Sequence, residues 1–147
     1  MAGVFVTLLL LGGICGSIAV FWVSGWPVIA KDFPSEPEYR GKWFRSPTTT
    51  LGFVRMGPWI KMGCSTEGLH LELSFPVRLF FRSVFIPWED IAVESGTVFC
   101  WLVPACHFCF GGRYSRLKVS RGTVRLMVAY MREEFGQRPP CLSGMSE

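Results

Sequence analysis

The chain has 147 residues, a formal net charge of +4 and a hydrophobic share of 50%. This length allows one domain of ordinary size plus a short accessory segment, because two separate cores would each be too small. The mean hydropathy of +0.33 is high for a water-soluble protein. Lysine and arginine are scattered among acidic residues without a block of like charge, which argues against a nucleic-acid partner.

The first charged residue of the chain is Lys31. Before it, Val4 to Val23 form a run of twenty residues without charge, which as a helix spans roughly the 30 Å hydrocarbon core of a bilayer. No positive segment precedes this run and bulky residues close it, features that do not favour a cleaved signal peptide. We therefore expect an uncleaved, single-pass transmembrane anchor over residues 1–25.

Two tryptophans mark the C-terminal end of the expected anchor. Indole rings commonly rest at the headgroup level, and cationic residues flanking a span favour the cytoplasmic side. The sequence therefore predicts Trp22, Trp26 and Lys31 at the membrane interface, in contact with lipid. Because the opposite flank has no Lys or Arg, we expect the C-terminal domain to be cytoplasmic, at the inner (plasma) membrane of a bacterium.

Within the expected anchor, Gly12 and Gly16 form a GxxxG pair. Such a pair lets two helix backbones approach closely, so a helix-dimer face and a homodimer form one hypothesis. The alternative, that the glycines reflect only the frequency of glycine in membrane helices, stays open.

Residues 26–42 are rich in proline and polar side chains, a composition typical of a stiff linker. Beyond Trp43 the apolar residues alternate, which predicts short strands. Residues 59–62 and 69–73 are expected to form a hairpin, because Gly68 supplies a turn glycine between them. Further strands are expected over 84–88, 91–94, 97–102, 106–110 and 116–120, with Pro104 separating two arms.

The last periodic segment has helical spacing. A start at Gly122–Thr123 and a stop at Gly136 bracket a helix whose apolar stripe we expect to pack on the core: Val124, Met127, Val128, Met131 and Phe135. Together these patterns predict an N-terminal transmembrane helix followed by a mainly β small domain over 43–137 with one C-terminal amphipathic helix, then a flexible tail over 138–147.

Two motifs of the β region carry a family resemblance. The hairpin Glu67-Gly68-Leu69 is followed by Ile86-Pro87-Trp88-Glu89-Asp90-Ile91, and Ser24-Gly25-Trp26 precedes both. This combination resembles a family of uncharacterised, membrane-anchored bacterial proteins with a pleckstrin-homology-like (PH-like) domain. The resemblance implies a PH-like fold and membrane anchoring, and it brings no catalytic residue. The chain departs from that pattern in its cysteine-rich stretch at 100–109.

That stretch places four soft ligands close together: Cys100, Cys106, His107 and Cys109. Cys106 and Cys109 form a CxxC pair, so a metal or thiol centre is one hypothesis. In a strand, however, successive side chains point to opposite faces, and Cys100, Cys106 and His107 could not share one. We therefore expect no metal and no other cofactor here. Residues 98–110 are instead either buried hairpin arms or a hairpin tip that dips into the membrane interface.

Motifs for catalysis are missing from the sequence. It contains no GxSxG, HExxH or phosphate-binding glycine loop. Glu89 and Asp90 are adjacent, an arrangement that does not support paired acid–base work, and His70 is expected at the surface. We therefore expect no enzyme and no catalytic residue, but a membrane-anchored binding or scaffolding module of unknown ligand. The alternatives are a structural subunit of a larger membrane assembly and the thiol or metal centre at Cys100–Cys109.

Overall fold

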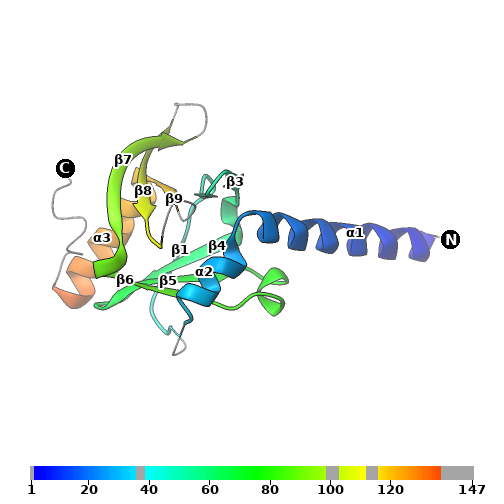
Figure 1. Cartoon of the computed structure of the whole chain (residues 1–147), viewed down its shortest axis with the longest axis horizontal. Helices are drawn as coiled ribbons and strands as arrows, with labels where there is room; N and C mark the ends of the chain where they lie inside the picture. The colour runs from blue at the N-terminus through cyan, green and yellow to red at the C-terminus, as the bar shows by residue number, and fades with distance from the viewer. Residues whose placement is uncertain (1, 36–38, 99–102, 112–115, 137–147) are drawn as a thin grey trace.

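The computed structural model describes residues 2–35, 39–98, 103–111 and 116–136. A long N-terminal helix precedes two antiparallel sheets and a C-terminal helix (Figure 1). The four-stranded sheet has the order β1-β4-β5-β6, with strands Trp43–Arg45, Ile60–Cys64, Gly68–Leu73 and Val84–Pro87. The five-stranded sheet has the order β3-β2-β9-β8-β7, with strands Val54–Arg55, Thr50–Leu51, Arg116–Ser120, Val103–Cys109 and Ala92–Val98. A mainly β domain is thus confirmed.

The predicted hairpin is confirmed as β4 and β5. Its turn is closed by a 3.0 Å hydrogen bond from the Ser65 amide to the Gly68 carbonyl oxygen. Gly68 is the first residue of β5 and does not have the positive φ expected of a turn glycine; it is required because a Cβ there would collide with the carbonyl oxygen of Ile86 on β6. Register pairs Met62 with Leu71 on the core face and Lys61 with Glu72 on the outer face.

The predicted break at Pro104 is wrong. Pro104 lies inside β8 opposite Thr97 of β7, and β7 runs without interruption from Ala92 to Val98. Pairing of β8 with β9 begins only at Ala105, so Pro104 occupies the end of β8 that has a single neighbouring strand. Proline has no backbone amide hydrogen to donate, so it is tolerated in a strand where no second neighbouring strand needs that hydrogen bond.

Three short strands escaped prediction. β1, β2 and β3 have only two or three residues each, too few to show an alternating pattern. Two single 3₁₀ turns were also not expected, η1 at Gly57–Trp59 and η2 at Val77–Leu79, whereas a third, η3 at Trp88–Asp90, agrees with the turn expected at Glu89 and Asp90. Of these, η2 shapes the loop between β5 and β6, which lies on the same side of the domain as the N-terminal helix (Figure 1).

The predicted C-terminal helix is confirmed as α3, Arg121–Phe135. The Ser120 side chain accepts a hydrogen bond from the Thr123 amide at its start, and Gly136 ends it with a φ of 64°. The expected apolar stripe packs on the core, with Val124, Met127 and Met131 buried. α3 contacts strands of both sheets.

The N-terminal helix α1 spans Ala2–Val23, and a second helix, α2, spans Trp26–Asp32. α1 projects away from the domain, so the N-terminus is remote from the sheets (Figure 1). The first part of the predicted linker is therefore ordered as a helix, and its Trp26 and Ile29 belong to the hydrophobic core. The proline content of this segment did not predict α2, because Pro27 lies in the first turn of the helix, where no amide hydrogen is needed.

Candidate functional site

The most unusual surface of the molecule is α1 itself. It is the one helix in the described residues that is long and apolar enough to cross a membrane, and only 6% of its span Val6–Val23 is buried. Leu8, Leu9 and Leu10 are each more than 60% exposed. Length and composition of this kind fit a membrane anchor or a signal sequence.

The end of α1 is seated in the β domain. Phe21 and Ser24 are buried, and Gly25, with a φ of 83°, turns the chain into α2. The turn carries Trp26 into the core, where its indole Nε1 donates a 3.1 Å hydrogen bond to the Arg82 carbonyl oxygen. α1 is thus connected to the domain by packed side chains rather than by a free linker.

The structure separates the three residues expected at the membrane interface. Trp22 is 64% exposed in the last turn of α1, and Lys31 is exposed on α2. Trp26, in contrast, is fully buried, so its ring contacts protein side chains where the sequence predicted the headgroup region. The positive φ at Gly25 between the two tryptophans is what sends them to different environments.

Gly12 and Gly16 both lie on an open part of α1. Apart from the backbone of α1 itself, no atom lies within 4 Å of the place where a Cβ of either residue would be, and the same holds for Gly13. The neighbouring small pair, Gly13 and Ser17, instead lines a groove between α1 and the β5–β6 loop. The GxxxG pair therefore leaves room for a second helix, while the adjacent pair faces this chain's own loop.

The outer face of the four-stranded sheet carries an aromatic cluster. Tyr39 stacks on His70 with ring centroids 4.6 Å apart, and meets Trp43 edge-on at 4.8 Å. Its hydroxyl donates to the Cys64 carbonyl oxygen at 2.9 Å and accepts from the Cys64 amide at 3.1 Å. Gly63 lies beneath the ring, where a Cβ would collide with it. The cluster therefore depends on a glycine in β4.

Next to this cluster is a groove of about 490 Å³. Its lining combines aromatic, charged and polar side chains, among them Tyr39, Trp43, His70, Glu72 and Arg82. A concave surface with a few convergent polar groups is the usual form of a ligand site. This groove is the best candidate for such a site on the described part of the domain.

His70 was expected at the surface, and that expectation is wrong. The side chain is buried beneath Tyr39 and beside Phe85, and its Nε2 lies 3.2 Å from the Ser65 hydroxyl. Its Nδ1 is a buried polar atom with no hydrogen-bond partner among the described residues. Burial lowers the pKa of His70, which favours the neutral imidazole. Burial also raises the pKa of Tyr39, so the phenol stays protonated.

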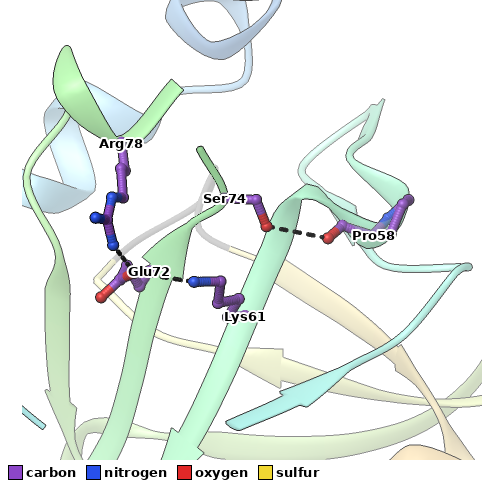
Figure 2. A network of polar contacts seen from close by, with 5 residues as sticks. All are labelled: Pro58, Lys61, Glu72, Ser74 and Arg78. Atoms are coloured by element: carbon purple, nitrogen blue, oxygen red, sulfur yellow. Dashed lines mark hydrogen bonds and ion pairs between the residues drawn. The ribbon is translucent and has the colours of Figure 1, made fainter. Parts of the chain in front are cut away.

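A polar network supports the sheet beside this groove. Glu72 on β5 accepts a 3.2 Å contact from Lys61 Nζ on β4 and a 3.5 Å contact from Arg78 in η2 (Figure 2). Directly after β5, the Ser74 hydroxyl donates to the Pro58 carbonyl oxygen in η1. The ion pairs of Glu72 join the β5–β6 loop to the outer face of the sheet, and the Ser74 bond joins it to η1.

The cysteine-rich stretch is divided by the sheet. Cys106 is buried on the core face of β8, whereas His107 and Cys109 lie on the opposite face and are partly exposed. Cys100 lies outside the described residues, as does Trp101. Burial raises the pKa of both the Cys106 and the Cys109 thiol, away from the thiolate that metals and disulfide exchange require. No group of three potential metal ligands occurs within the described ranges.

The apolar segment 98–110 also falls partly outside the described residues, since 99–102 are not among them. Its described part, β8, is the strand between β7 and β9, with Cys106 and Phe108 buried. These residues are core.

No protein-family model, curated protein or solved structure matches the chain.

Proposed function

We propose that the chain is a non-enzymatic binding or scaffolding module that α1 anchors in the inner membrane of a bacterial cell. The exposure of α1 is the observation that carries this proposal. Twenty-two residues form an uncharged helix whose leucines face outward. Soluble proteins rarely expose contiguous apolar patches beyond a few hundred Å². Lipid would remove this surface from water.

The arrangement of the domain supports a PH-like fold as part of this proposal. β1, β4, β5 and β6 form one sheet, the consecutive strands β7, β8 and β9 form most of the other, and α3 contacts both. Such a domain would present the groove beside Tyr39 and His70 to a peptide, a protein partner or a lipid headgroup. The groove supports a binding role, because a concave surface with a few convergent polar groups is the usual form of a ligand site.

The proposed orientation places the β domain in the cytoplasm. Lys31, Arg40 and Lys42 follow α1 on the domain side, and Lys and Arg close to the end of a span favour the cytoplasm. In that compartment the thiols of Cys64, Cys106 and Cys109 would stay reduced.

Membrane fractionation of the full chain tests the anchor. We expect the protein to stay with the membrane after alkaline carbonate extraction. A variant with Leu9→Arg and Leu10→Arg should be released, because each arginine at the centre of a span costs about 2.5–3.5 kcal/mol. Leu126→Arg, on an exposed position of α3, is the matched control and should remain bound. Recovery of the unaltered chain in the soluble fraction would sink the proposal.

A reporter fused after Glu147 tests the orientation separately. A reporter that works only in the cytoplasm should be active. Activity of a reporter that works only outside the membrane would reverse the proposed topology without affecting the anchor.

The open face at Gly12 and Gly16 favours a second candidate function, a subunit of a homodimer or larger membrane assembly. Chemical crosslinking in native membranes should then give a dimer that Gly12→Leu and Gly16→Leu weaken. Gly3→Leu, elsewhere on α1, is the control and should preserve the dimer. If none of the three substitutions changes the yield of crosslinked dimer, the face at Gly12 and Gly16 is not the dimer contact.

A further inference from the structure

The β5–β6 loop, residues 74–83, ends in an exposed apolar tip. Phe75, Leu79 and Phe80 are 68%, 67% and 57% exposed. Three large apolar side chains together in a short loop are unfavourable in water at roughly 25 cal/mol per Å². The loop lies on the side of the domain from which α1 projects (Figure 1).

The loop lies beside α1 and contacts it through η2. An apolar groove of about 280 Å³ lies between them, lined by Pro76, Val77 and Phe80 from the loop and by Ile14 and Ile18 from the helix, among others. These two isoleucines are nine and five residues before Val23, which corresponds to about 14 and 8 Å along the helix axis. If Val23 marks the membrane surface and α1 crosses the bilayer from there toward Ala2, this part of the loop lies about 8–14 Å deep, at or below the roughly 5–10 Å at which interfacial elements rest.

Several backbone amides of the loop have hydrogen-bond partners inside the protein. The amides of Arg78, Leu79 and Phe80 donate to carbonyl oxygens within the loop, and the Ser74 amide donates to Trp59. Backbone in lipid requires such internal partners. Arg78 is the one charged residue between Ser74 and Phe81, and it points back to Glu72 on the sheet (Figure 2).

Cationic side chains lie at the base of the tip. A second groove, of about 480 Å³, is lined by Ile18, Trp22 and Phe80 together with Lys31 and Arg82. An indole, two cations and Phe80 of the apolar tip thus line the same groove. Such a combination suits the boundary between the headgroups and the acyl chains of an anionic leaflet.

We infer that the β5–β6 loop inserts into the leaflet nearest the β domain, beside the end of α1, with Lys31 and Arg82 at the lipid phosphates. The occupant of the apolar tip is lipid acyl chain. This inference rests on the proposed anchor function of α1. The domain would therefore contact the membrane at two points, through α1 and through the tip of the β5–β6 loop.

Photocrosslinking of the full chain in nanodiscs of phosphatidylglycerol and phosphatidylcholine tests the inference. A benzophenone amino acid replaces Leu79, Leu126 or Leu10 in separate preparations, and lipid adducts are measured by mass spectrometry. Leu126 is the matched control, because it is 63% exposed like Leu79 but lies on α3, away from α1 (Figure 1). Leu10 reports on the anchor. We expect lipid adducts at Leu10 and Leu79, several-fold above Leu126.

The outcomes separate the two proposals. Lipid adducts at Leu10 without adducts at Leu79 would overturn the loop insertion and leave the anchor standing. Adducts at neither position would overturn both. A crosslinked dimer at Leu79 in place of lipid would assign the tip to a second copy of the chain, and equal yields at Leu79 and Leu126 would also contradict the inference.

Discussion

Trp26 and Arg82, 56 residues apart in the sequence, are joined by a 3.1 Å hydrogen bond from the indole Nε1 to the carbonyl oxygen. The bond ties the turn after α1 to the end of the β5–β6 loop. The indole is fully buried, whereas Arg82 is an exposed residue. The junction between α1 and the domain is therefore part of the hydrophobic core.

Replacing Trp26 should destabilise the domain strongly. Trp26→Ala leaves a cavity and an unsatisfied carbonyl, and we expect a loss of about 3–5 kcal/mol in the free energy of unfolding. Thermal unfolding of the detergent-solubilised chain measures it. Trp22→Ala, at the 64% exposed tryptophan, is the control and should change stability by less than about 0.5 kcal/mol. Equal losses in the two variants would contradict the placement of Trp26.

The stability of the domain should fall in mild acid through His70. Its pKa is lowered by burial, so below the unfolded value of about 6.5 the unfolded state binds more protons than the folded state. The free energy of unfolding should therefore decrease as the pH drops from about 7.5 to 5. His70→Gln should flatten this dependence, whereas His107→Gln should keep it because His70 remains. An unchanged pH profile in His70→Gln would exclude this role.

Removing the N-terminal cap of α3 should cost a moderate amount of stability. Ser120→Ala deletes the acceptor for the Thr123 amide, and such substitutions typically cost about 1 kcal/mol. Chemical denaturation of the unaltered chain and of Ser120→Ala measures the difference in the free energy of unfolding, provided that this free energy has the same dependence on denaturant concentration in both. Ser95→Ala, at an exposed position of β7, serves as the comparison and should have a smaller effect. If the two substitutions prove equivalent, the cap contributes nothing.

Glu72 should control the order of the β5–β6 loop. Glu72→Gln removes the charge that holds Lys61 and Arg78, and partly exposed ion pairs of this kind contribute about 0.2–1 kcal/mol. We expect faster amide hydrogen exchange at Leu79 and Phe80. The control is Glu89→Gln in η3, an exposed carboxylate on another turn. Unaltered exchange in the loop of Glu72→Gln would show that other contacts position it.

Elements encoded by local pattern were predictable. The uncharged run of α1, the alternating strands around Gly68 and the capped amphipathic helix α3 each carry their signal within a few residues. The periods of 2 and 3.6 residues are visible in the sequence itself. Burial of the Met127 and Met131 stripe followed from the same periodicity.

The candidate site was less predictable, because it depends on contacts between distant residues. Burial of His70 requires Tyr39 to fold over β5, and the place of Pro104 depends on where β9 begins to pair. The GxxxG pair and the CxxC pair are visible in the sequence, but the faces on which they lie are not.

The sequence by itself determined that the chain has one long uncharged helix before a small β domain, because hydrophobic run length and alternation are local properties. Tertiary structure alone decided that Trp26 is core while Trp22 is exposed, since a left-handed turn at Gly25 and a bond to Arg82 separate two residues of the same type. It also decided that the apolar tip of the β5–β6 loop lies beside α1. That arrangement has no signature in either segment, because it results from packing of residues about 60 positions apart.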